Sequence, residues 1–79
     1  MDLGEAIAKR IEDLCKERGI SINRLATLSG LTQSTIDSIL KGKSRNPRLS
    51  TIRKICDGLG ISLKEFLDHP LIDNAEKGD

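Results

Sequence analysis

Apolar residues recur at intervals of three or four along most of the chain, which places them on one face of an α-helix. The first stripe predicts a helix over about residues 3–18 and consists of Leu3, Ile7, Ile11, Leu14 and Cys15. Four further stripes predict shorter helices. The second helix, about 22–28, has Leu25 and Ala26 inward, and the third, about 33–41, has Ile36, Ile39 and Leu40 inward. The fourth carries Leu49, Ile52, Ile55, Cys56 and Leu59, and the fifth carries Leu63, Phe66 and Leu67. No run alternates with a period of two between turn residues, so no strand is expected. The pattern predicts an all-α bundle of five helices.

The same three-residue signal separates neighbouring helices in three places. Each signal holds a glycine that can end one helix in the left-handed conformation, and a hydroxyl residue that can cap the next helix. The apolar residue between them can pack against a residue inside the next helix as a hydrophobic staple. The signals are Gly19-Ile20-Ser21, Gly30-Leu31-Thr32 and Gly60-Ile61-Ser62, with staple partners Leu25, Ile36 and Phe66. Ser62 and Glu65 also predict a capping box at the last helix.

The length of 79 residues suits a single domain, which we place at residues 1–70. Pro70 is expected to stop the fifth helix, and His69 to interact with the dipole at its C-terminal end. Residues 71–79 are acidic and are predicted to form a frayed tail.

Composition excludes several classes of protein. Hydrophobic residues make up 37% and charged residues 32%, which argues against a disordered chain. No apolar run approaches the ~20 residues of a membrane span and the start lacks a secretory signal, so a cytoplasmic protein is expected. Cys15 and Cys56 fall on predicted apolar faces, with no histidine at ligand spacing. We expect buried reduced thiols, no metal site and no cofactor.

The formal net charge of +1 says little about partners, but the charges are unevenly distributed. Six basic residues and no acidic one lie between Ser38 and Cys56, whereas five acidic residues and one lysine lie from Glu65 to the end. Such segregation makes one face attractive to a polyanion. An isolated basic run is more often a solvated loop, but this one directly follows the helix predicted at about 33–41.

Residues 22–41 have the spacing of two short helices joined by a tight turn. A large side chain at Ala26 would push the two helices apart, and a side chain at Gly30 would strain a positive φ. The apolar residues that would hold the pair together are Leu25, Leu31, Ile36 and Ile39. This arrangement is typical of a helix-turn-helix motif over about 22–41, with Ala26, Gly30 and Ile36 as its structural residues.

From about residue 5 to 69 the chain resembles the Cro/CI-type (XRE-like) family of phage and bacterial regulators, which includes the lambdoid repressors. The basic segment Lys41-Gly42-Lys43-Ser44-Arg45-Asn46-Pro47 and the later Gly60-Ile61-Ser62 leading to Phe66-Leu67 carry the resemblance further. The resemblance implies the lambda-repressor-like fold and a small transcriptional regulator, expected to be a repressor, that binds a specific sequence of double-stranded DNA. Its recognition helix, about 33–41, would lie in the major groove.

The outer side of the recognition helix carries the residues expected to read bases. Glutamine can pair bidentately with adenine, and serine can donate or accept a hydrogen bond. The resemblance points to the same positions, because Gln33, Ser34 and Ser38 match those that touch base edges in lambdoid repressors. Serine reaches less far, so methyl contacts or water are expected to carry part of the specificity at Ser38.

Asp37 is unexpected on a helix that faces DNA, since its carboxylate repels phosphates. It could accept from a cytosine amino group, or it could pair with Lys41 four residues on. The pair with Lys41 is the favoured interpretation.

A second set of residues is expected to contact the sugar-phosphate backbone and so to position the protein. Ser21, Asn23 and Arg24 open the second helix, where free N–H groups and the helix dipole suit a phosphate. Ser21 can serve equally as a plain cap, and Thr35 is expected at a phosphate or a thymine methyl group. The other members are Thr32, Lys41, Lys43, Ser44, Arg45, Asn46 and Arg48.

Arg48 departs from the family pattern, because many relatives carry a capping serine or threonine before the fourth helix. A phosphate clamp and a frayed helix start would each explain the arginine.

Two other classes of function were weighed against DNA binding. An enzyme is not expected, because the single histidine lacks a nucleophile partner and no glycine loop cradles a phosphate. An antitoxin-like or accessory protein-interaction module is the alternative on the same fold. Such a module would need aromatic or apolar anchors on the outer side of residues 33–41, which is polar.

A single module of this kind buries only ~600–1,000 Å² on DNA, so a homodimer is expected to read two half-sites. The candidate dimer surface is the fifth helix and the tail, with Leu63, Leu67, Leu71 and Ile72. No small-molecule effector is expected.

Overall fold

The computed structural model describes residues 1–42 and 46–76, and these residues form six helices. The helices are α1 (Leu3–Arg18), α2 (Ile22–Ser29), α3 (Gln33–Leu40), α4 (Leu49–Leu59), α5 (Leu63–Leu67) and α6 (Pro70–Asp73). No strand occurs in this part of the chain, where the one isolated bridge joins Asp2 to Glu76. The all-α class is confirmed, with one helix more than the five expected.

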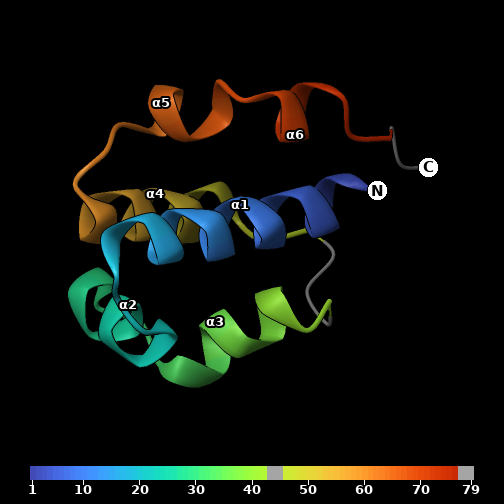
Figure 1. Ribbon diagram of the computed structural model, residues 1–79. Coiled ribbons are helices and arrows are strands. Elements are labelled where there is room, and N and C mark those ends of the chain that lie inside the picture. Colours follow the sequence, from blue (N-terminus) through green and yellow to red (C-terminus); the bar gives the residue numbers. More distant parts are fainter. Residues whose placement is uncertain (43–45, 77–79) are drawn as a thin grey trace.

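The helices are arranged in three layers (Figure 1). α1 and α4 form the middle layer, α2 and α3 lie together on one side of it, and α5 and α6 lie on the other. Both ends of the described chain are near α6, because the backbone N–H of Glu76 donates to the Met1 carbonyl at 2.9 Å. The middle layer is thus covered on two sides, and α3 belongs to an outer layer.

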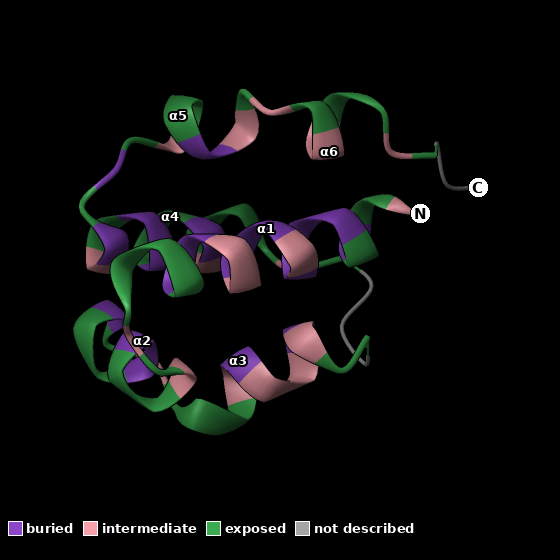
Figure 2. Cartoon of the chain, viewed as in Figure 1, coloured by how far each residue is buried: buried purple, intermediate pink, exposed green. Residues whose placement is uncertain are grey.

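The core fills the spaces between the layers (Figure 2). Most of its buried side chains come from α1 and α4 and from the sides of the outer helices that pack against them. Its largest fully buried side chains are Phe66, Ile11, Leu25, Ile36, Ile55 and Cys56. Two members of the expected stripes lie outside it, since Leu3 is 47% exposed and Leu49 is 60% exposed. Each is the first residue of its helix, where the stripe runs past the end of the neighbouring layers.

All three glycine signals close a helix in the same way, as expected. At Gly30, with φ of 67°, the glycine N–H donates to the Thr27 carbonyl at 3.2 Å and the Leu31 N–H donates to the Ala26 carbonyl at 3.0 Å. These two bonds define a Schellman motif. Ser21, Thr32 and Ser62 then cap the following helices through their side-chain oxygens. Six residues at the expected staple positions lie in the core or against it: Ile20, Leu25, Leu31, Ile36, Ile61 and Phe66.

The capping box is complete at a different helix from the expected one. Ser62 accepts from the Glu65 N–H at 3.0 Å, but among the residues described no bond returns from the Glu65 side chain. At α1, Asp2 accepts from the Glu5 N–H at 2.8 Å, and the Glu5 carboxylate accepts from the Asp2 N–H at 3.2 Å. The reciprocal box therefore stabilises the start of the longest helix.

The segment from residue 71, expected as a frayed tail, instead begins with helix. Pro70 starts α6 rather than simply ending α5, because a proline at the first helical position lacks an N–H that would be unpaired anyway. His69 caps this helix at its N-terminus: its Nδ1 atom accepts from the Leu71 N–H at 3.1 Å. The expected role of His69 at a helix C-terminus is therefore wrong, and Ile72 packs against the core.

Two arginines of α1 bind the carbonyl ends of other helices: Arg10 joins the middle layer to α5, and Arg18 joins α1 to α4 within the middle layer. Arg10 is 8% exposed and donates from Nε to the Phe66 carbonyl and from Nη2 to the Glu65 carbonyl, both at 3.1 Å. Arg18 donates from Nε to the Leu59 carbonyl at 3.1 Å. Such carbonyls lack hydrogen-bond partners within their own helix and lie at the negative end of its dipole. A guanidinium supplies both the missing donors and a positive charge.

The cysteines are free and buried, as expected. Burial raises the pKa of both the Cys15 and the Cys56 thiol, because the thiolate would lose its hydration. Both side chains therefore pack as small neutral groups in the core.

The closest approach of α2 to α4 is at Gly58. A Cβ atom added there would lie 2.5 Å from Ser29 Oγ, 3.0 Å from the Ser29 nitrogen and 3.1 Å from the Leu28 carbonyl carbon. Ser29 Oγ is itself buried without a hydrogen-bond partner among the residues described. The absence of a side chain at Gly58 is what lets the end of α2 rest on α4.

We predict that Gly58→Ala lowers the free energy of unfolding by about 1–3 kcal/mol, as measured by urea denaturation. Alanine would gain up to ~1 kcal/mol of helix propensity, but its methyl group would force the two helices apart.

Ser29→Ala is the matched control and should be nearly neutral, because it removes a buried hydroxyl that has no partner. Combined with Gly58→Ala it should restore part of the lost stability. A Gly58→Ala protein as stable as the wild type would contradict the close crossing.

Candidate nucleic-acid interface

Helices α2 and α3 form the expected bihelical motif. Residues 30–32 join them, with Gly30 in the left-handed conformation that the sequence predicted. Leu25, Ala26 and Ile36 are buried at 0%, 3% and 0% exposure, which holds both helices against the core. The polar side of α3 consequently faces away from the middle layer.

The outer side of α3 is polar and accessible. Ile36 and Ile39 are buried on the inner side, whereas Gln33 and Ser34 are exposed and Ser38 is partly exposed. In Figure 2 the exposed start of α3 forms one edge of the molecule. All three expected base-reading residues therefore lie on the surface of one helix, within two turns.

Thr32 and Thr35 fix the start of α3. The Thr32 hydroxyl accepts from the Thr35 N–H at 3.2 Å, and the two hydroxyl oxygens are 2.9 Å apart. The Thr35 hydroxyl thus has one partner in the protein, through an exposed hydrogen bond, and it keeps further hydrogen-bonding capacity.

The start of α2 supplies a second exposed group of polar residues. Ser21 caps the helix by accepting from the Arg24 N–H at 3.0 Å, so its expected capping role is confirmed. Asn23 and Arg24 are exposed in the first turn. Because α2 and α3 belong to the same layer, both groups lie on the side of the molecule opposite to α5 and α6 (Figure 1).

The basic segment after α3 is described only in part. Lys41 is exposed at the C-cap of α3, and Asn46 and Arg48 are exposed before α4. Lys43, Ser44 and Arg45 lie outside the described residues. Arg48 is the N-cap of α4 and makes no side-chain capping bond, so its guanidinium is not used at the helix start.

Asp37 does not form the expected ion pair with Lys41 among the residues described. Lys41 is the C-cap of α3 and its backbone N–H donates to the Asp37 carbonyl at 2.9 Å, so the helical spacing is present although the two side chains do not pair. The favoured interpretation of Asp37 is therefore wrong.

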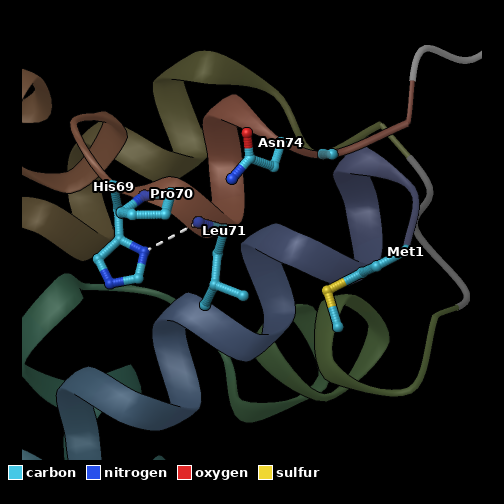
Figure 3. Close-up of a pocket in the computed structure, with 6 residues that line it drawn as sticks. Met1, His69, Pro70, Leu71 and Asn74 are labelled. Atoms are coloured by element: carbon cyan, nitrogen blue, oxygen red, sulfur yellow. Dashed lines mark hydrogen bonds between the residues drawn. The ribbon is translucent and has the colours of Figure 1, made fainter.

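A hollow of about 440 Å³ lies between Met1 and the α6 segment. Met1 and the α6 segment line it, and in Figure 3 the Met1 and Leu71 side chains approach the same space. It brings together Met1, His69, Pro70, Leu71, Asn74 and Ala75. This lining is mostly apolar and offers no cluster of acids or bases.

The described residues offer neither a metal site nor a membrane-spanning helix. They contain no group of three or more histidine, cysteine, aspartate or glutamate side chains placed to hold a metal ion. Among those same residues no helix combines the length and the apolar character needed to cross a bilayer.

Comparisons with known proteins agree with this geometry. The family model of the Cro/C1-type HTH DNA-binding domain matches residues 10–71. The HTH-type transcriptional regulator PuuR of Escherichia coli (strain K12) is 41% identical over 69 residues, covering 87% of this chain and 37% of PuuR. The HTH-type transcriptional repressor RghR of Bacillus subtilis (strain 168) is 35% identical over 57 residues, covering 72% of this chain and 42% of RghR. The chain thus spans less than half the length of these two relatives.

A solved structure is similar over nearly the whole molecule. The crystal structure of the prophage Lp1 protein 11 matches with a TM-score of 0.80 and 42% sequence identity. The match covers 89% of this chain and 93% of that one, so the same arrangement of helices extends across both.

Proposed function

Because this chain belongs to the family of Cro/C1-type helix-turn-helix DNA-binding domains, we propose that it is a small repressor that reads a specific sequence of double-stranded DNA. The observation that carries this proposal is the polar, accessible outer side of α3, whose inner side is anchored by Ile36 and Ile39. A helix of this kind fits the major groove and presents its first residues to base edges.

Gln33, Ser34 and Ser38 would read the bases. Gln33 is exposed in the first turn of α3, where its amide can reach the N6 and N7 atoms of adenine. Ser34 is its exposed neighbour, and Ser38 follows Ser34 by one turn on the same side. Ser38 is partly exposed and short, which favours contact through water or a thymine methyl group.

The flanking residues would hold the protein on the phosphates. Arg24 and Asn23 stand in the first turn of α2, beside the positive end of its dipole. Lys41, Asn46 and Arg48 are exposed after α3, and we assign the same role to Lys43, Ser44 and Arg45 from their sequence alone. Thr32 caps the recognition helix, and Thr35 would contact a phosphate or a thymine methyl group.

The protein would bind as a homodimer, because a single module buries too little surface to select one site. Less of the expected dimer surface is free than the sequence suggested, since Leu63, Leu67 and Ile72 pack against the core. Leu71 remains at the hollow, together with Met1, which is 51% exposed. We place the dimer contact at this hollow, beside α6 and the N-terminus.

Selection from a random duplex library at physiological salt tests the function. We expect enrichment of a near-palindrome with half-sites about one helical turn apart. A folded protein that enriches no sequence would overturn the proposal in favour of a protein-interaction module.

We predict different effects for a base-reading and a phosphate-binding residue. Gln33→Ala should reduce discrimination at one base pair by ~1–3 kcal/mol, because it removes a bidentate contact. Arg24→Ala is the comparison: it should weaken binding to every duplex and lower the slope of log affinity against log salt by about one unit. Fluorescence anisotropy with matched and mismatched duplexes measures both. A uniform loss from Gln33→Ala would contradict its reading role.

We predict that Leu71→Asp reduces dimerisation at least tenfold, because it places a charge in an apolar contact, at a cost of ~1.4 kcal/mol or more. Sedimentation equilibrium and the cooperativity of binding to the near-palindrome are the readouts. Lys64→Asp is the control, since Lys64 is exposed on α5 and does not line the hollow. Unchanged mass and cooperativity in Leu71→Asp would exclude this surface.

A further inference from the structure

Asp37 lies on one flank of the outer side of α3, on the same stripe as Gln33. It follows Gln33 by one turn and precedes Lys41 by one turn, and it is partly exposed. The inner side of the same helix is taken by Ile36 and Ile39, which are 0% and 2% exposed. A helix in the major groove would therefore bring the Asp37 carboxylate toward the bases along with Gln33.

No described cation neutralises this carboxylate. The chain does form ion pairs at a spacing of four residues elsewhere, between Lys9 and Asp13 at 2.7 Å and between Arg53 and Asp57 at 3.4 Å. Asp37 and Lys41 have the same spacing and no such pair, and the Asp37 carboxylate accepts no hydrogen bond from the described residues. Within residues 1–42 and 46–76, its acceptor capacity is therefore unused.

The chemistry of a carboxylate selects one base among four. An ionised aspartate only accepts hydrogen bonds, and guanine offers only acceptors in the major groove. Thymine offers an acceptor and a methyl group, and adenine places its N7 acceptor beside its amino donor. Cytosine presents the N4 amino donor without an adjacent acceptor, so it is the base that best suits a carboxylate.

We propose that Asp37 is a specificity-determining residue that accepts a hydrogen bond from the N4 amino group of a cytosine in each half-site. This inference rests on the proposed function of α3 as the base-reading helix. The carboxylate has a second effect, because it repels the phosphates of every duplex. A duplex that places a cytosine opposite Asp37 compensates for that repulsion with a hydrogen bond, and other duplexes do not. Asp37 therefore lowers non-specific binding and also favours one base.

Library selection with Asp37→Asn provides the sharpest test. Asparagine can pair bidentately with the N6 and N7 atoms of adenine, so the preferred base at one position of each half-site should change from cytosine to adenine. Because one negative charge is removed, binding to unrelated duplexes should also become stronger, by about two- to tenfold at low salt.

Two further variants separate base reading from a general effect of charge. Asp37→Glu keeps the carboxylate and should retain the cytosine preference. Asp73→Asn makes the same change of net charge on α6, on the far side of the molecule from α3, and should leave the enriched sequence unchanged (Figure 1). Circular dichroism of each variant establishes that it is folded, and Asp37→Glu still tests the inference if Asp37→Asn does not fold.

Failure of this inference is distinguishable from failure of the proposed function. A wild-type protein that enriches a near-palindrome, together with an Asp37→Asn protein that enriches the same one, would overturn the role of Asp37 and leave the function intact. A wild-type protein that enriches nothing would overturn the proposed function itself. Loss of the cytosine in Asp37→Glu, with folding intact, would also count against base reading by the carboxylate.

Discussion

Apart from the 16-residue α1, the helices in the described part of this protein are too short to persist alone, and this constraint governs the rest of the structure. α2 and α3 have eight residues each and α5 has five, whereas isolated helices below ~12–15 residues are marginal in water. Each short helix must therefore be held by its apolar side. For α3 the holding side chains are Ile36 and Ile39, which leaves the opposite side free to carry polar residues chosen for DNA rather than for packing.

Polar interactions at helix ends determine the directions and relative positions of the helices, which apolar packing alone does not specify. Glycine turns with capping hydroxyl residues set the direction in which each helix leaves the last, and the turn at Gly30 does so for α2 and α3. Arg10 and Arg18 then bind α1 to the carbonyl ends of α5 and α4. Because buried hydrogen bonds to a charged group are costly to break, the Arg10 contacts fix α5 against the middle layer, and the partly buried Arg18 contact holds α1 beside α4.

The local features of the fold could be predicted from the sequence, because each depends on residues close together in the chain. The glycine turns, the caps at Ser21 and Thr32 and the staple positions are of this kind. Arg10 was not recognised, although a basic residue between Ile7 and Leu14 on an apolar stripe was a visible signal. Its partner, the Phe66 carbonyl, is 56 positions away, and only the tertiary fold brings it near. The close approach at Gly58 and the packing of α6 on α1 are long-range in the same sense.

The candidate site was predictable to a similar depth. The exposure of Gln33 and Ser34 follows from helical spacing, whereas the expected pair between Asp37 and Lys41 does not form among the described residues, although their helical spacing is present. Spacing places two side chains within reach of each other, but it does not decide whether two solvated side chains pair. The assignment of bases to side chains depends on the DNA, so it stays a prediction from chemistry.

The central claim is that α3 and the start of α2 form the DNA-binding surface. Amide chemical-shift mapping by NMR, with the duplex enriched by library selection, tests it most directly. We predict that the largest shifts occur from Thr32 to Lys41 and from Ser21 to Arg24, with smaller ones in α5 and α6. Shifts centred on α5 and α6, with α3 unaffected, would contradict the claim.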